Sequence, residues 1–324
     1  MTSRISTLLL AVVALALPHT TAIAQSYPNR TITVVVPSPP GGGDDFTGRL
    51  FAQHLGEATG QPVVVENLTG AGGTIAYASV VRAAPDGYRL LIATSGQTTF
   101  PALYSSLSFD PVENLEPISL IFKTPFGVTV TSKLNAKTLP EFIQLAKSSP
   151  GKLNFGSGGN GTGNHIAGEL FKKLTGTDIV HVPFKGAGPA MTALLGGQIE
   201  VMFATMTTAG LASQNAAGTV RVLAVSGDKR STSLPAVPTA AEAGLEGYNA
   251  LIWWGVSAPK GTPPEIIARL NAEVRSMLQK PAVRQKLQDM GGVPLGTSSA
   301  EAKEQIARET KELTAFVSTL GIKQ

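Results

Sequence analysis

The chain has 324 residues, 43% of them hydrophobic, which suffices to bury the core of one large domain or of two medium domains. This composition excludes a disordered or a fibrous protein. The formal net charge of +4 is spread along the chain without a dense basic run, so no nucleic acid is expected as a partner.

Residues 1–24 have the features of a signal peptide for export. An arginine precedes an apolar stretch, residues 8–17, and the small residues Ala22 and Ala24 have the spacing of a signal peptidase site. We therefore expect cleavage between Ala24 and Gln25 and a protein located in the periplasm. No later segment offers about 18 consecutive apolar residues, so the mature chain is expected to be soluble.

The sequence contains no cysteine. Disulfides, thiolate metal sites, a cysteine nucleophile and a lipoprotein anchor are therefore ruled out. The histidines show no spacing typical of a metal site, so neither a metal nor a cofactor is expected.

The first part of the chain alternates strand and helix patterns. TITVVV (31–36), PVVVEN (62–67) and RLLIAT (89–94) are apolar runs of strand length, and each is followed by a loop rich in glycine or hydroxyl residues. Helical spacing follows the first two loops. Continuous apolar strands that alternate with helices indicate a mainly parallel sheet covered by helices on both faces.

The same pattern starts again near Thr124 and continues to about Ser226, and three amphipathic helices are predicted at 263–280, 281–290 and 299–318. We expect these last helices to pack on the first part of the chain. The predicted fold class is α/β with two lobes, each a mainly parallel sheet flanked by helices. Lobe 1 is predicted to comprise residues 25–124 plus 250–324, and lobe 2 residues 125–249.

Four loops at strand ends are candidate ligand-binding segments: PPGGGDD (39–45), TGAGGT (69–74), TSGQTT (94–99) and GSGGNGTGNH (156–165). The N-terminus of a helix presents free backbone N–H groups and the positive end of a dipole, which suits a carboxylate. Alternatively, the glycines serve only tight turns between strand and helix. Three such loops in the predicted lobe 1 and one in lobe 2 favour a shared role in an interlobe cleft.

Nucleotide-binding motifs are not supported. Gly156, Gly158 and Gly161 match G-x-G-x-x-G between a strand and a helix, but the following strand VHVPF does not end in an acidic residue that would hold a ribose. No G-x-x-x-x-G-K-[ST] segment is present. A dinucleotide or a nucleoside triphosphate is therefore not expected.

Three histidines remain after the predicted cleavage. His54 is expected on the surface of the first helix or with satisfied hydrogen bonds, and His181 is expected to be structural because it alternates with apolar residues in a strand. For His165, at the start of a helix, a ligand contact and a capping or packing role are both open. No nucleophile elbow and no H-E-x-x-H motif accompanies them.

Two aspartates and two tryptophans require interpretation. Asp45 is predicted to be the N-cap of the first helix, with a polar contact to ligand or water as the alternative. Asp44 and Asp45 together disfavour an anion bound at that helix start alone. Trp253 and Trp254 are expected to pack in the core or between the lobes, with stacking on a ligand as the alternative.

Six segments together resemble one known family over essentially the whole mature length: VVPSPPGGGDDFTGRL, GQPVVVENLTGAGGTIA, APDGYRLLIAT, HVPFKGAGPAMTALLGGQIEVMF, RVLAVSGDKRSTSLPAVPTAAEAG and APKGTPPEIIARLN. The chain resembles the extracytoplasmic solute receptors of tripartite tricarboxylate transporters, the Bug-type periplasmic binding proteins.

The resemblance implies a two-lobed receptor that closes on a small organic acid, a carboxylate, and delivers it to the membrane permease subunits of a tripartite transporter. A monomer without catalytic activity is expected. By position, the resemblance assigns ligand contacts in lobe 1 to Pro40, Gly41, Gly42, Asp45, Thr94, Ser95 and Gln97. In lobe 2 it assigns them to Gly156, Ser157, Asn160, His165, Phe184, Lys185 and Phe203.

The chain departs from the family pattern at three places. Gly43 and Asp44 stand where the family has proline and a small hydroxyl residue, Phe184 replaces a tyrosine, and Leu68 replaces an arginine. These departures favour a less highly charged or a more aromatic acid than citrate.

Two other functions stay open on the sequence alone. An exported hydrolase or transferase would use Ser157 or Ser95 with His165, although no third catalytic residue is evident. A binding protein that serves a membrane signalling sensor would have the same fold and the same kind of site.

Overall fold

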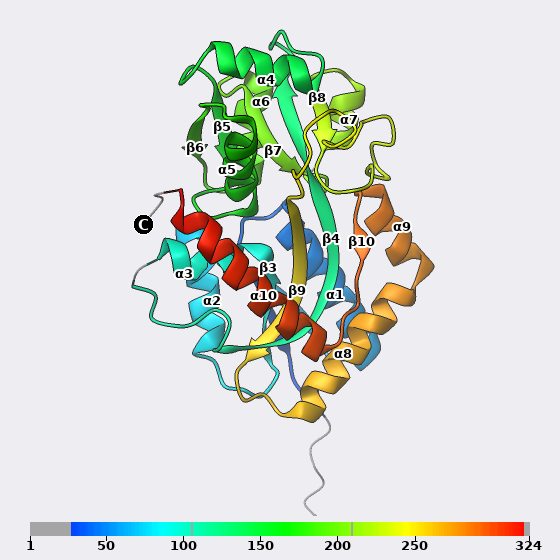
Figure 1. The fold of residues 1–324 in the computed structure, drawn as a ribbon. Helices are drawn as coiled ribbons and strands as arrows, with labels where there is room; N and C mark the ends of the chain where they lie inside the picture. The colour runs from blue at the N-terminus through cyan, green and yellow to red at the C-terminus, as the bar shows by residue number, and fades with distance from the viewer. Residues whose placement is uncertain (1–26, 105, 209, 321–324) are drawn as a thin grey trace, which may run out of the picture.

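The computed structural model describes residues 27–104, 106–208 and 210–320. Two sheet regions with flanking helices form two lobes, and the long strand β4 (Leu115–Thr131) runs through both of them (Figure 1). The predicted two-lobed α/β fold is confirmed. The predicted signal peptide, residues 1–24, and its cleavage after Ala24 lie outside the described residues.

The sheet of lobe 1 is mixed. Its strand order is β2, β1, β3, β9, β4, and β10 pairs with the outer edge of β4. The pairs β1–β2 and β1–β3 are parallel, whereas β9 is antiparallel to both of its neighbours because the chain re-enters this sheet from lobe 2. Beside β4, the strands are β1 (Ile32–Val36), β2 (Val63–Asn67), β3 (Arg89–Thr94), β9 (Leu251–Pro259) and β10 (Val293–Pro294).

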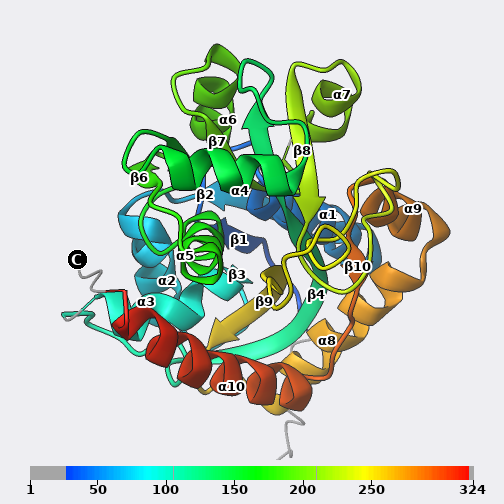
Figure 2. The same ribbon diagram turned by 45° about the horizontal axis from the view of Figure 1, so that its top comes forward.

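Helices cover lobe 1 on both faces, including the three C-terminal helices that the sequence predicts. Among these three, α8 packs against α1, and α10 crosses β4 and reaches the 3₁₀ turn η3 (Figures 1 and 2). The helices of lobe 1 are α1 (Gly43–Thr59), α2 (Thr74–Val81), α3 (Phe100–Leu103), α8 (Pro264–Gln279), α9 (Pro281–Asp289) and α10 (Ser299–Ser318), with the 3₁₀ turns η2 (Ala71–Gly73) and η3 (Ser95–Thr99).

Lobe 2 is built on the other end of β4, which pairs with β7 on one side and β8 on the other. β5 is parallel to both β7 and β6, and β6 forms the edge. The strands are β5 (Asn154–Ser157), β6 (Val180–Pro183), β7 (Val201–Thr205) and β8 (Val220–Val225), and the helices are α4 (Leu139–Ser148), α5 (Gly163–Thr175), α6 (Ala187–Gly196) and α7 (Leu211–Ala216).

β4 changes partners between two adjacent residues. Pro125 pairs with Leu251 of β9, whereas Phe126 pairs with Thr205 of β7. The division into residues 25–124 plus 250–324 and residues 125–249 remains a proposal, and this change of partner supports it. One connection between the lobes is therefore the continuous strand β4, and the other is the non-strand segment that precedes β9 at Leu251.

Local sequence accounts for many of the element boundaries. The side chain of Thr138 accepts a hydrogen bond from the Glu141 N–H and caps α4, and Ser298 forms a capping box with Glu301 at the start of α10. Gly60 ends α1 in the left-handed conformation. The four predicted loops lie at the ends of β1, β2, β3 and β5.

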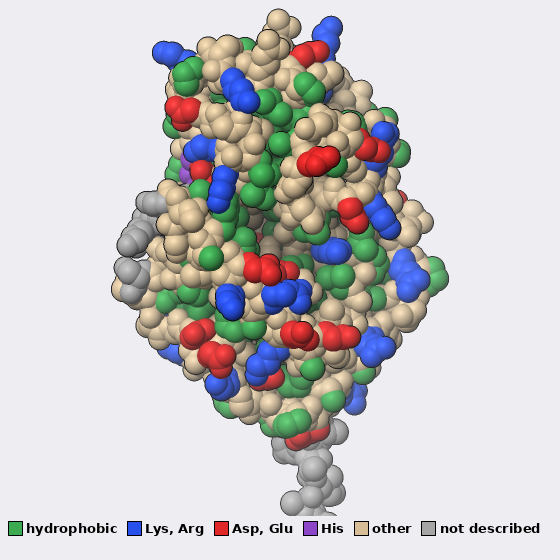
Figure 3. All heavy atoms as spheres, viewed as in Figure 1, with side chains coloured by type: hydrophobic (Ala, Val, Ile, Leu, Met, Phe, Trp, Pro, Cys, Tyr) green, Lys and Arg blue, Asp and Glu red, His purple; other side chains and the backbone are tan. Residues whose placement is uncertain are grey.

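The described residues contain no helix that is long and apolar enough to cross a membrane. On the face viewed in Figure 3, basic and acidic side chains are intermingled, and neither sign dominates a large area. Within the described ranges, no group of three or more His, Asp or Glu side chains is arranged to hold a metal ion.

Candidate functional site

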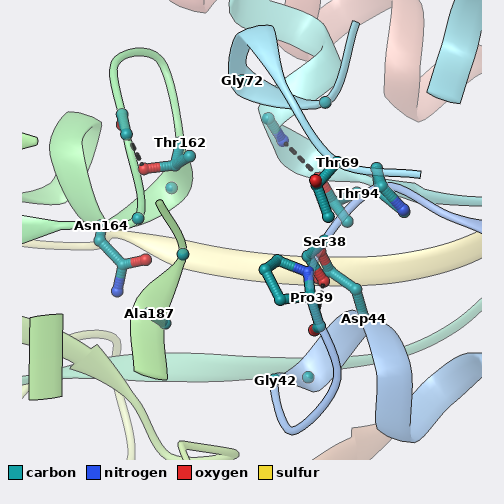
Figure 4. A pocket seen from close by; sticks show the side chains of 18 of the residues that line it. Ser38, Pro39, Gly42, Asp44, Thr69, Gly72, Thr94, Thr162, Asn164 and Ala187 are labelled. Carbon is teal, nitrogen blue, oxygen red and sulfur yellow. Dashed lines mark hydrogen bonds between the residues drawn. The ribbon is translucent and has the colours of Figure 1, made fainter. Parts of the chain in front are cut away.

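A cavity of about 660 Å³ lies between the lobes and is lined by residues from both of them. Lobe 1 contributes residues 37–40, 42–44 and 69–73 together with Thr94 and Gly96, and lobe 2 contributes segments around 158–164 and 184–189. Figure 4 shows Ser38, Pro39 and Asp44 on one side and Thr162, Asn164 and Ala187 on the other. All four loops that the sequence singles out thus meet at one cavity.

Asp45 holds the first loop in place. Its carboxylate accepts hydrogen bonds from the Gly41 N–H (3.2 Å), from Arg49 Nε (3.0 Å) and from Asn67 Nδ2 (3.1 Å). The predicted N-cap role is wrong, because α1 begins at Gly43 with Gly42 as its N-cap, which puts Asp45 on the third helical residue. Burial alone raises the pKa of Asp45, but the hydrogen bonds from Arg49, Asn67 and Gly41 together lower it.

Asp44, one residue earlier in the helix, lines the cavity. Its Oδ1 accepts a hydrogen bond of 2.6 Å from the indole Nε1–H of Trp254 on β9. Burial raises the pKa of Asp44; hydrogen bonds from Trp254 and Ser38 oppose this shift, and the charge of Asp45 adds to it. The hydrogen bonds to the Asp44 carboxylate therefore offset only part of the cost of burying its charge.

Trp254 has both a packing role and a place in the cavity. Its ring stacks on Phe122 with the centroids 4.7 Å apart, which confirms the expected packing, and one part of the residue lines the cavity. A Cβ atom on Gly43 would overlap the Trp254 ring and the Thr207 hydroxyl. Glycine at position 43 therefore allows α1 to begin directly against Trp254, which gives a physical reason for this departure from the family pattern.

Two stacked histidines support the lobe 2 loop that lines the cavity. His165 is 2% exposed, its Nδ1 accepts a hydrogen bond of 3.0 Å from the Gly161 N–H, and its ring stacks on His181 at 3.9 Å between centroids. His181 Nε2 lies 2.6 Å from Ser157 Oγ. Burial lowers the pKa of His165 to about 3 and that of His181 to about 4, with the neighbouring charges adding to this shift, so both rings are neutral at pH 7.

The two lobes touch at the rim of the cavity. Thr99 Oγ1 of η3 lies 3.1 Å from the carbonyl oxygen of Gly161 in lobe 2 and 2.7 Å from that of Gly96 in its own turn, so its hydroxyl proton is shared between the two acceptors. On another part of the rim, Gly186 has φ +117° and lies so close to Pro39 that an added Cβ would come within 3.3 Å of its ring. The structure is therefore in a closed arrangement around the cavity.

The cavity has few charged side chains. Among its lining residues only Asp44 and Lys185 carry a charge, and the others contribute hydroxyl, amide, aromatic and backbone groups. The first N–H groups of α1 have no partner within the helix, and that of Asp44 already interacts with its own carboxylate. This arrangement can bind a small polar molecule and offers it both donors and one acidic acceptor.

A comparison with protein-family models identifies the family of this chain. The model described as "Tripartite tricarboxylate transporter family receptor" matches residues 47–322. The chain belongs to this receptor family. It is 36% identical over 302 residues to protein BugT of Bordetella pertussis, which covers 93% of this chain and 92% of that protein.

Solved structures agree with this assignment. The chain superimposes on the periplasmic binding protein BugD with a TM-score of 0.86 at 31% identity, covering 92% of this chain and all of BugD. A protein of R. palustris solved with adipate has a TM-score of 0.86 and 33% identity, covering 90% of this chain and 98% of that protein. The Bug-type resemblance drawn from the sequence is confirmed.

The lining contains some of the contacts that the tripartite-receptor resemblance assigns and not others. Pro40, Gly42, Thr94, Phe184 and Lys185 line the cavity. For the others, a ligand contact remains a prediction, because the structure places them next to or behind the lining: Gly41, Asp45, Ser95, Gln97, Gly156, Ser157, Asn160, His165 and Phe203. Leu68, the replacement for the family's arginine, packs against the core of lobe 1.

Several lining residues escape the sequence reasoning. Ser38 and Tyr77 line the cavity from outside the predicted loops, whereas Thr69, Thr162 and Asn164 lie within those loops but are not individually predicted to contact the ligand. The sequence favours packing of Trp254 over stacking on a ligand, and its strand joins the site from a distant part of the chain. Its contact with α1 exists only in the folded protein.

His54 and Ser157 have different surroundings from those that the sequence predicts. His54 is buried rather than on the surface, and its Nε2 lies 3.5 Å from Glu273 of α8. The pairing of Ser157 with His165 is wrong, because the Ser157 hydroxyl is fully buried and bonds to His181. The receptor family to which the chain belongs is not enzymatic.

Proposed function

We propose that this receptor captures a small organic acid in the interlobe cavity and presents it to the membrane permease subunits of a tripartite tricarboxylate-type transporter. The observation that carries the proposal is the closed cavity of about 660 Å³, onto which four loops at strand ends converge. Uncapped backbone N–H groups at the start of α1 supply donors for a carboxylate without an arginine in the lining. The similar R. palustris protein solved with adipate supports the same ligand class.

The protein is proposed to act as a monomer that opens and closes. A ligand that touches both lobes stabilises the closed arrangement only by the difference between its affinities for the closed and the open state. Ile252 and Trp254, which follow the second lobe connection, line the cavity, so a small change at that connection opens the rim. Catalysis is not part of the proposal.

A ligand screen tests the proposal. Mono-, di- and tricarboxylates, aromatic acids and amino acids are added to the mature protein, and unfolding is followed by differential scanning fluorimetry. A ligand at 100 times its Kd stabilises the folded state by about 2.7 kcal/mol, which raises the melting temperature by several degrees. Sugars and metal ions serve as controls, and a response to these alone, without any response to acids, would overturn the carboxylate assignment.

The transporter partner needs a separate experiment. The receptor, fixed in its closed form by a ligand found in the screen, is passed over immobilised permease subunits encoded in the same genome. We expect ligand-dependent retention. Retention by a membrane sensor and not by any permease would contradict the transport role while leaving the ligand class intact.

A further inference from the structure

We propose that Asp44 selects a ligand whose carboxylate stands beside a cationic nitrogen, as in an amino acid or a betaine. This inference rests on the proposed function and narrows its ligand class. Asp44 lies on the cavity surface, and its carboxyl group is held from behind by the indole of Trp254, so its orientation is preset before a ligand enters.

The geometry places a group that favours a negative charge next to a group that favours a positive charge. The start of α1 presents backbone N–H groups that favour a carboxylate, and Asp44 on the same helical turn presents an acidic oxygen. Trp254 Nε1–H donates to Oδ1, and Ser38 also hydrogen-bonds to the Asp44 carboxylate, so a cationic group of the ligand would share the carboxylate with these two donors. A ligand whose carboxylate and cationic nitrogen are bonded to the same carbon atom interacts favourably with both groups at once.

A purely anionic ligand fits this corner less well. A second carboxylate placed against Asp44 would repel it and would bind only by sharing a proton. Burial raises the pKa of Asp44, so its charged form gains from a cation and loses from another anion. Coulomb attraction between such partners is strong because the site is partly removed from water.

The other titratable groups near Asp44 do not supply the missing positive charge. Asp45 of the same helix is already paired with Arg49, and the Tyr77 phenol of α2 is neutral because burial raises its pKa. Lys185 lines the cavity from the opposite lobe and is itself exposed. The cation next to Asp44 must therefore come from the ligand.

Matched ligand pairs test the inference. Calorimetric titration compares norvaline with pentanoate and glutamate with glutarate, in which the pairs differ only by the amino group. We expect the amino acids to bind the unaltered protein at least about 10-fold more tightly. Asp44→Asn keeps the shape and removes the charge, and it should abolish this preference by weakening the amino acids while leaving the plain acids equal or tighter.

Three controls make the outcome decisive. Asp44→Glu retains the charge and should retain part of the preference, and Asp86→Asn removes a surface charge that pairs with Arg30 and should change nothing. The pH profile gives an independent readout: affinity for an amino acid should fall as pH falls through the pKa of Asp44, whereas proton sharing with a plain acid would make affinity rise.

The outcomes separate this inference from the proposed function. If plain acids bind as tightly as their amino counterparts, or if Asp44→Asn weakens both equally, the selection by Asp44 is wrong and the acid receptor stands. If neither member of any pair, nor any acid in the wider screen, raises the melting temperature, the proposed function itself fails.

Discussion

Trp254 and Asp44 are 210 residues apart in the chain, yet their side chains form a 2.6 Å hydrogen bond at the floor of the cavity. This bond joins β9 to the start of α1 within lobe 1. It thereby fixes the orientation of the acidic group that lines the cavity from this lobe.

Trp254→Phe removes the indole N–H and keeps an aromatic ring on Phe122. Asp44 loses a donor, its pKa rises further, and stability at pH 7 should fall by about 1–2 kcal/mol, measured by urea unfolding. Ligand affinity should change as well. Trp253→Phe is the matched control, because it removes a comparable bond, to Glu309 of α10, away from the cavity, and it should alter stability but not affinity. Equal effects of both variants on affinity would contradict the role assigned to Trp254.

Asp45→Ala should loosen the first loop. The substitution leaves the Gly41 N–H and Asn67 without their acceptor, and we expect a loss of about 2 kcal/mol at pH 7. Because the folded-state pKa of Asp45 is lowered, its contribution is present above the unfolded pKa of about 3.9 and is lost as pH falls through the folded value. Urea unfolding of both proteins at pH 7 and near pH 3 checks this, and a stability difference that does not shrink in acid would refute it.

His165 and His181 should make the protein sensitive to mild acid. In the unfolded chain both take up a proton near pH 6.5, whereas in the folded chain they do so only near pH 3 and pH 4. The folded state therefore loses up to about 1.4 kcal/mol per pH unit for each histidine as pH falls below 6.5. In a His165→Gln, His181→Asn double variant the slope of stability between pH 6.5 and 4.5 should be flatter, even if the variant is less stable at pH 7. An unchanged slope would show that other groups govern acid sensitivity.

Thr99→Val should weaken the closed arrangement. The substitution removes the hydroxyl that bridges η3 to the Gly161 carbonyl of lobe 2, and it keeps the side-chain volume. We expect ligand affinity to fall about 5-fold, equivalent to about 1 kcal/mol, and small-angle X-ray scattering to show a larger open fraction. Thr98→Val is the control, since Thr98 is equally buried but bonds only to the carbonyl of Ser95 in its own turn. If both variants bind alike, the Thr99 bond does not contribute to closure.

Local sequence was enough for most of the elements and for the place of the site. Runs of β-branched residues such as TITVVV bury both faces and therefore form strands, and the helical spacing of apolar residues predicts the C-terminal helices to within about one residue. The convergence of the glycine loops follows because the carboxyl ends of parallel strands lie at the same edge of a sheet. The short strand β10 was missed, since two residues carry no periodic signal.

The role of each loop side chain required the tertiary structure. Asp44 and Asp45 are identical in chemistry and adjacent in sequence, but successive residues of a helix point about 100° apart. Because α1 begins at Gly43, that rotation turns Asp44 to the cavity and Trp254, and turns Asp45 back to Gly41, Arg49 and Asn67.

The sequence by itself thus determined a two-lobed α/β fold with candidate binding loops at its strand ends, because short-range patterns of burial and backbone geometry carry that information; the receptor role followed from the family resemblance. Only the tertiary structure decided which of two neighbouring carboxyl groups lines the cavity, because the helix phase and a contact spanning 210 residues exist only after folding.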